Sequence, residues 1–164
     1  MAVTSRMEFI ARTQLTGTAA SVSFATGLSG FTKFFVVAYI VNDANAKSVS
    51  LTLNNDAVGA NYAYQYLDAT GATVSSGRGV TQNITVGTMD ASTAALFILE
   101  ISKPVAAEVA RYTIRAATQT TGIVFDAWAR EWTNTSAVIS RIDVGAVANN
   151  FAAGTRCLLY GSRD

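Results

Sequence analysis

Apolar and β-branched residues recur along the chain in short runs separated by Gly, Asn, Asp and Ser, and not at helical spacing. The run Lys33–Val41 is apolar on both faces, whereas Arg111–Ala116 alternates with a period of two. Successive side chains of a strand point to opposite faces, so this period predicts strands with one face in a core. We expect about ten strands. They are Met7–Thr13, Ser21–Phe24, Lys33–Val41, Val49–Leu53, Tyr62–Asp68, Ala94–Ser102, Arg111–Ala117, Gly122–Trp132, Ile139–Val144 and Arg156–Tyr160.

Weaker signals complete the pattern. Two further strands, Thr73–Ser75 and Asn83–Val86, are expected on either side of a turn at Gly77–Gly79. Helical spacing is scarce, and Pro104–Val109 alone predicts one short helical turn. Many short strands joined by turns are typical of a two-sheet antiparallel β-sandwich, which we expect to be jelly-roll-like. We predict one all-β domain at residues 7–164, after an N-terminal arm at residues 1–6.

Composition limits the functional classes. The 164 residues are 50% hydrophobic and only 14% charged, so much of the surface is neutral and part of it is expected to face another protein. The net charge is +1, and the nine Arg are spread from Arg6 to Arg163 without a cluster, so nucleic-acid binding is not expected. The longest strongly apolar run, Phe34–Val41, is far shorter than the roughly 20 residues of a membrane-spanning helix. The first residues do not resemble a signal peptide, which predicts a protein made in a cytoplasm.

Candidate chemistry is sparse. The chain has no His, which excludes Ser-His-Asp and Cys-His mechanisms, and its single cysteine, Cys157, cannot form an internal disulfide. Asp126 and Glu131 stand an odd number of residues apart, so an unbulged strand points them to opposite faces and they make a poor carboxylate pair. We predict that the protein is not an enzyme, with no catalytic residue and no cofactor.

The run Asn54-Asn55-Asp56, followed by Gly59 and Asn61, supplies oxygen atoms of the kind that bind calcium. The same residues are favoured in tight turns, because Asn and Asp tolerate a left-handed backbone. The acid-rich spacing of a calcium loop is absent, which favours the turn. A metal ion in the Asn54–Asp56 turn remains the open alternative.

Aromatic residues recur at alternate positions on two predicted strands. Trp128 and Trp132 share a face with Asp126 and Arg130, so this face either contacts a partner or places the tryptophans in the core with the two charges paired at an edge. The second interpretation is favoured. Tyr62, Tyr64 and Tyr66 also share a face, and packing within the sheet is favoured over stacking on a sugar ring.

Four stretches together resemble a family of small β-sandwich proteins and domains that recur as structural components of tailed-phage particles. They are residues 7–13 with 17–24, residues 51–56 with 61–67, Trp-Thr-Asn-Thr-Ser-Ala-Val-Ile-Ser-Arg-Ile at 132–142, and Asn-Phe-Ala-Ala-Gly-Thr-Arg-Cys-Leu-Leu-Tyr-Gly at 150–161. Their order and spacing cover nearly the whole chain, although residues 76–120 match poorly. The resemblance implies a structural or attachment role and carries over no catalytic residue.

Within that class, a free-standing module is suited to a capsid decoration or cement protein. It would bind between subunits of the major capsid protein on the virion surface, as a homotrimer, after synthesis in the cytoplasm of a host bacterium. The alternative is a host-attachment module of a tail or head fibre that binds cell-surface glycan through Tyr62 or Tyr64. Candidate partner contacts are the arm residues Met1, Val3 and Arg6, the face of Trp128, Arg130 and Trp132, and Asn149, Asn150 and Phe151 in the loop Gly145–Gly154.

Overall fold

The computed structural model describes residues 6–43, 45, 47–70, 73–79, 85–103, 107–119 and 123–163. These residues form twelve strands and one 3-10 turn, η1 (Gly59–Asn61). The strands are β1 (Glu8–Gln14), β2 (Ser21–Phe24), β3 (Lys33–Val41), β4 (Lys47–Leu53), β5 (Tyr62–Thr70), β6 (Thr73–Gly79), β7 (Thr85–Met89), β8 (Ala94–Ser102), β9 (Ala110–Gln119), β10 (Ile123–Trp132), β11 (Ile142–Ala146) and β12 (Arg156–Ser162). Eight strands form one antiparallel sheet, in the order β1-β12-β3-β8-β9-β10-β5-β6, and four form another, in the order β2-β11-β4-β7.

The chain is rolled up as a set of nested strand pairs. β1 pairs with β12, β2 with β11, β3 with β8 and β4 with β7. The outermost and third pairs lie in the large sheet, and the other two lie in the small sheet, which is the arrangement of a jelly roll. The expected two-sheet, jelly-roll-like β-sandwich is therefore confirmed.

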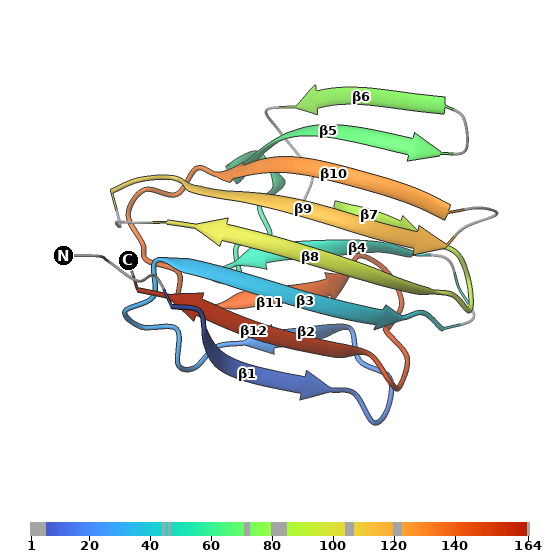
Figure 1. Ribbon diagram of the computed structural model, residues 1–164, viewed down its shortest axis with the longest axis horizontal. Helices are drawn as coiled ribbons and strands as arrows, with labels where there is room; N and C mark the ends of the chain where they lie inside the picture. The colour runs from blue at the N-terminus through green and yellow to red at the C-terminus, as the bar shows by residue number, and fades with distance from the viewer. Residues whose placement is uncertain are drawn as a thin grey trace.

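Two hairpins are inserted into this jelly roll and widen one of its sheets. β9 and β10 follow β8 in the large sheet, and β5 and β6 add to the free side of β10. β7, at the edge of the small sheet, contacts β9. Figure 1 shows β5 and β6 extending beyond the small sheet, which lies behind β12, β3, β8 and β9. The large sheet therefore has an inner face that the small sheet covers only in part, and an outer face turned away from it.

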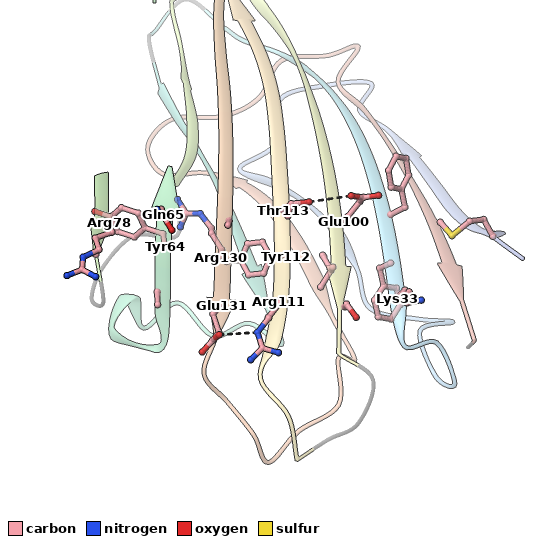
Figure 2. Close-up of a pocket in the computed structure, with 18 residues that line it drawn as sticks. Lys33, Tyr64, Gln65, Arg78, Glu100, Arg111, Tyr112, Thr113, Arg130 and Glu131 are labelled. Atoms are coloured by element: carbon pink, nitrogen blue, oxygen red, sulfur yellow. Dashed lines mark hydrogen bonds and ion pairs between the residues drawn. The ribbon is translucent and has the colours of Figure 1, made fainter. Parts of the chain in front are cut away.

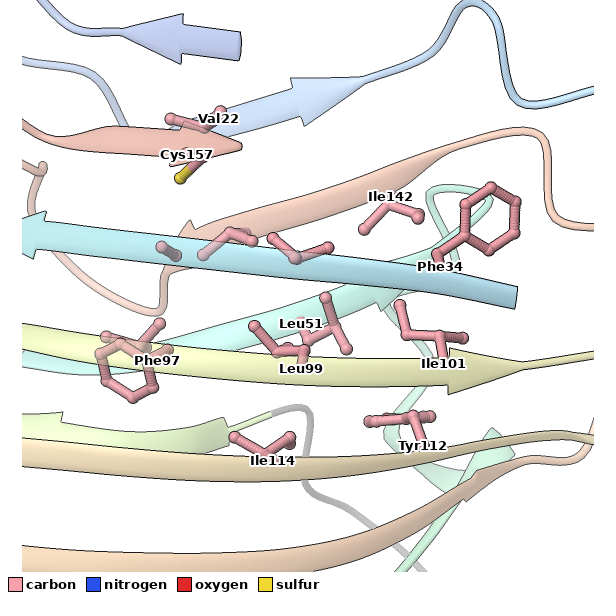
Figure 3. Close-up of a cluster of buried hydrophobic side chains, with 14 of the residues drawn as sticks. Val22, Phe34, Leu51, Phe97, Leu99, Ile101, Tyr112, Ile114, Ile142 and Cys157 are labelled. Atoms are coloured by element: carbon pink, nitrogen blue, oxygen red, sulfur yellow. The ribbon is translucent and has the colours of Figure 1, made fainter. Parts of the chain in front are cut away.

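The core lies between the two sheets. In β3, Phe34, Val36, Ala38 and Ile40 are buried while the residues between them are more exposed, as a period of two requires. Their partners on β8 and β9 continue the same buried rows, and Leu51 and Ile142 face them from the small sheet (Figure 3). Burying an aliphatic side chain of this size contributes about 1.5–3 kcal/mol, so these rows hold the sheets together.

Most predicted strands are confirmed within a few residues, including both weaker ones, and three details differ. Gly77–Gly79 is not a turn, because β6 continues through it to Gly79. The strand expected from Ile139 begins at Ile142. The helical turn expected at Pro104–Val109 lies partly outside the described residues, and its described part, 107–109, is non-helical.

The two glycines of β6 are required by aromatic rings on the neighbouring strand. Gly77 pairs with Tyr66 and Gly79 pairs with Tyr64. A Cβ atom built on either glycine would lie 2.6 Å from the Cε1 atom of the opposite tyrosine. The missing side chains therefore make room for the rings, and the rings cover a strand that has little side-chain bulk of its own.

This arrangement predicts the effect of adding one methyl group. Gly79→Ala should lower the free energy of unfolding by about 1–3 kcal/mol, because the Tyr64 ring must move away from its neighbours. Gly17→Ala is the matched control, since a Cβ there meets no atom within 4 Å. Urea unfolding of both variants tests this. Equal stabilities would show that Gly79 is not required by the ring.

Candidate functional site

A groove of about 720 Å3 lies on the outer face of the large sheet. It crosses β3, β8, β9, β10, β5 and β6, and Figure 2 shows the side chains that line it. A volume of this size is within the range of sites that bind small molecules. Its polar lining includes Lys33, Gln65, Arg78, Glu100, Arg111 and Glu131.

Weak contacts link the charged side chains of the groove. Arg111 Nε lies 3.3 Å from Glu131 Oε2, and the hydroxyl of Thr113 donates to Glu100 Oε2 over 3.4 Å. Arg115, beside the groove, places a guanidinium nitrogen 3.9 Å from Glu100 Oε2. These side chains are exposed, where an ion pair contributes about 1 kcal/mol or less. Their charges are therefore available to an incoming partner.

Beside the groove, the outer face carries an aromatic cluster from three adjacent strands. The ring of Tyr160 on β12 lies 5.7 Å from that of Phe9 on β1 and 6.5 Å from that of Phe35 on β3. Phe9 is 59% exposed, and Met7 next to it is also exposed. An exposed Phe packed edge-on against a Tyr offers a partner a large apolar contact with few rotatable bonds.

Positively charged residues that are far apart in the sequence lie on this same face. Strand registers place six cations on it: Arg12, Lys33, Arg78, Arg111, Arg115 and Arg156. The described acidic residues on this face are Glu100 and Glu131. Cations that are scattered along the sequence thus share one face of the sheet, which sequence reasoning missed.

The expected mixed face of β10 lies on the inner face, near the exposed end of the large sheet. Arg130 is only 3% exposed, and its guanidinium carbon lies 4.5 Å from the Trp128 ring centre and 5.4 Å from that of Tyr64. Burial lowers the pKa of Arg130, while the nearby Tyr112 hydroxyl raises it. The ring faces stabilise the buried cation through cation–π attraction. Half-buried Trp128 also packs 4.7 Å from Tyr66, so this cluster belongs largely to the protein's own packing.

Trp132 and Tyr62 are completely buried and fix a turn at one end of the core. Trp132 Nε1 donates to Asp56 Oδ2 over 2.8 Å, and the Tyr62 hydroxyl donates to the Asp56 carbonyl over 2.8 Å. The Tyr62 hydroxyl also accepts the Leu53 N–H. Neither side chain is accessible at the surface. The predictions that Trp132 contacts a partner and that Tyr62 contacts a glycan are therefore wrong. The core interpretation of Trp132 is confirmed.

The Asn54–Asp56 turn uses its oxygen atoms as hydrogen-bond acceptors. Asn54 and Asn55 have φ of 53° and 59°, the left-handed values expected of a tight turn. Asn54 Oδ1 accepts from the backbone N–H groups of Ser140 and Arg141. Asp56 accepts from Trp132, Asn61 and Val58. The turn interpretation is confirmed, and these oxygens are engaged by N–H donors.

Two of the three expected loop contacts are at the surface. Asn149 and Asn150 are exposed, and Asn149 has a left-handed φ of 66°. Phe151 is completely buried and bridges Ala19 and Asn42, so its role as a partner contact is wrong.

Met1 and Val3 lie outside the described residues, while Arg6 is exposed. The side chain of Asp126 is also outside the described part, so its pairing with Arg130 stays a prediction.

The cysteine thiol and clusters of metal-ligating residues are two further candidates for chemistry. Cys157 is fully buried, and burial raises the pKa of its thiol to about 12, so it remains an unreactive thiol at neutral pH. No group of three or more Cys, Asp or Glu that could hold a metal ion occurs within the described part of the chain. In that same part, none of the helical structure is long and apolar enough to cross a membrane.

Asp56 should make stability depend on pH. Burial raises the pKa of Asp56, but hydrogen bonds from Trp132, Asn61 and Val58 outweigh it and lower the pKa below 3.8. The stabilisation is therefore present above the unfolded-state pKa and is lost as pH falls through the folded-state pKa. Asp56→Asn should cost about 1–3 kcal/mol at pH 7, with the difference from wild type shrinking near pH 3.

Urea unfolding of both proteins at pH 7 and pH 3 tests this expectation. Asp90→Asn is the matched control, because Asp90 accepts its described hydrogen bonds through its backbone carbonyl. If Asp56→Asn and Asp90→Asn cost the same at pH 7, the Asp56 carboxylate does not anchor the turn.

Compared with models of protein families, with curated proteins and with solved structures, the chain matches none of them.

Proposed function

We propose that this protein is a structural component of a phage-type virus particle and that it acts as a capsid decoration or cement protein. The observation that carries the proposal is the outer face of the large sheet, where aromatic, aliphatic and charged side chains lie together on eight strands. Exposed Phe9, Tyr39 and Leu96 are among them. Large apolar areas on a protein surface mark places where another protein binds.

The fold is compatible with this proposal. Jelly rolls are common in viral capsid proteins and in lectins, although one fold serves many functions. The stretches that suggested the phage family also meet in space: Asp56 binds Trp132, Asn54 binds Ser140, and β1 pairs with β12. These contacts build the framework of the jelly roll, so the resemblance concerns the fold more than the binding surface.

A cement protein should occur in many copies per particle and should stabilise the shell by adding buried contact area. Quantitative mass spectrometry of purified particles should find it at a fixed ratio to the major capsid protein, and light scattering of the free protein should report a homotrimer. Particles produced without its gene should lose their DNA at a lower temperature. A copy number of a few per particle, or unchanged thermal resistance, would contradict the cement role.

A second candidate function is glycan binding by a host-attachment module, and the groove favours it. Phe35 lines the groove together with Gln65 and Thr113, so an aromatic residue and hydrogen-bonding side chains share it, whereas the Tyr64 ring lies on the inner face against Arg130 and Trp128. Sugar sites combine these two features.

A glycan array tests this candidate. Gln65→Ala should abolish any binding without disturbing the core, because Gln65 is an exposed residue of the outer face. Tyr39→Ala serves as the matched control, since Tyr39 is an exposed aromatic residue that does not line the groove. Absence of binding to any glycan by the wild-type protein would remove this candidate.

A further inference from the structure

The outer face of the large sheet has a charge that differs from that of the whole chain. It carries six of the chain's twelve Lys and Arg residues but only two of the described acidic residues, Glu100 and Glu131. The face therefore has a net charge of +4, whereas the chain has +1. The six cations come from five different strands, β1, β3, β6, β9 and β12, and so cover the width of the sheet. Such a field attracts acidic partners and orients them before contact.

Apolar side chains lie among these cations. Phe9, Tyr39 and Leu96 are exposed on the same face, and the guanidinium carbon of Arg156 lies 5.2 Å from the Tyr39 ring centre. Aromatic residues and Arg together are typical of the centre of protein interfaces. The face can therefore bury apolar area and neutralise charge in a single contact.

The area of the face is sufficient for a stable complex. Eight strands about 4.8 Å apart, each seven to ten residues long at about 3.3 Å per residue, give a face of roughly 1,000 Å2. A typical stable interface buries about 800 Å2 on each partner. One partner that covers the whole sheet would thus form an interface of ordinary size.

We propose that the outer face of the large sheet docks onto an acidic protein surface of the particle, with the six cations selecting that surface. This inference rests on the function proposed above and names the face and the chemistry of its partner. A second copy of the chain is a poor occupant, because two faces of +4 charge would repel each other. Nucleic acid is also less suitable, because Glu100 and Glu131 lie among the cations and would repel phosphate groups.

Charge variants test the proposal in both directions. Lys33→Glu with Arg78→Glu takes the net charge of the face from +4 to 0. Glu100→Gln with Glu131→Gln raises it to +6. The matched control, Lys47→Glu with Arg163→Glu, changes the total charge as much as the first variant does, but Lys47 lies on β4 of the small sheet and Arg163 follows the end of β12.

The assay is co-sedimentation of each labelled protein with particles that lack it, after circular dichroism has shown that each variant is folded. At about 50 mM salt the neutral variant should bind about tenfold or more weakly, the +6 variant several-fold more tightly, and the control within about twofold of wild type. At about 1 M salt the differences should shrink, because the screening length falls to about 3 Å.

The other outcomes contradict different parts of the proposal. If wild type binds the particles and all variants bind equally well, the docking face is wrong while the virion role stands. If wild type neither binds the particles nor occurs in them, the virion role itself fails. If the protein instead binds a 30-nucleotide oligothymidylate with the same charge dependence and does not bind the particles, the face is a nucleic-acid surface and the protein partner is excluded.

Discussion

Strand register is the constraint on which the rest of the structure depends. From β1 to β6 the large sheet keeps one set of residues on its inner face, and a slip of one residue in any pair would exchange the two faces of that strand. The buried rows through Val36, Leu99 and Ile114 hold the register because they fill the core. The same register determines which residues point to the outer face. Its arginines share one face because the core fixes which residues remain outside.

The part of the large sheet that extends beyond the small sheet needs another cover for its inner face. A sheet with nothing over its inner face would leave apolar and charged groups in water. Here Tyr64 and Tyr66 lie flat over Gly79 and Gly77, and Trp128 packs against both rings. Arg130 is enclosed by the same rings. The aromatic layer thus covers the inner face where the second sheet does not reach, while the broad outer face stays uncovered.

Sequence pattern predicted the strands well and the site poorly, for a physical reason. A short apolar run between turn residues is a local signal, so β3 and β8 were predicted to the residue. Alternation within a strand is also local. It also placed Trp128 and Trp132 on one face, but it could not show that the core covers Trp132 and leaves Trp128 half exposed. The charged face joins residues as distant as Arg12 and Arg156, and their proximity depends on strand order. Strand order is set by the packing of the whole chain.

The position of β12 between β1 and β3 has a consequence for how the protein forms during synthesis. Both neighbours are made more than a hundred residues earlier, so each has an unpaired edge until residues 156–162 leave the ribosome. Contacts between such distant segments slow folding, because a long loop must close before they are made. The growing chain therefore carries two open strand edges for most of its synthesis, a state in which nascent chains aggregate readily. Completion of the last strand is the event that seals the large sheet.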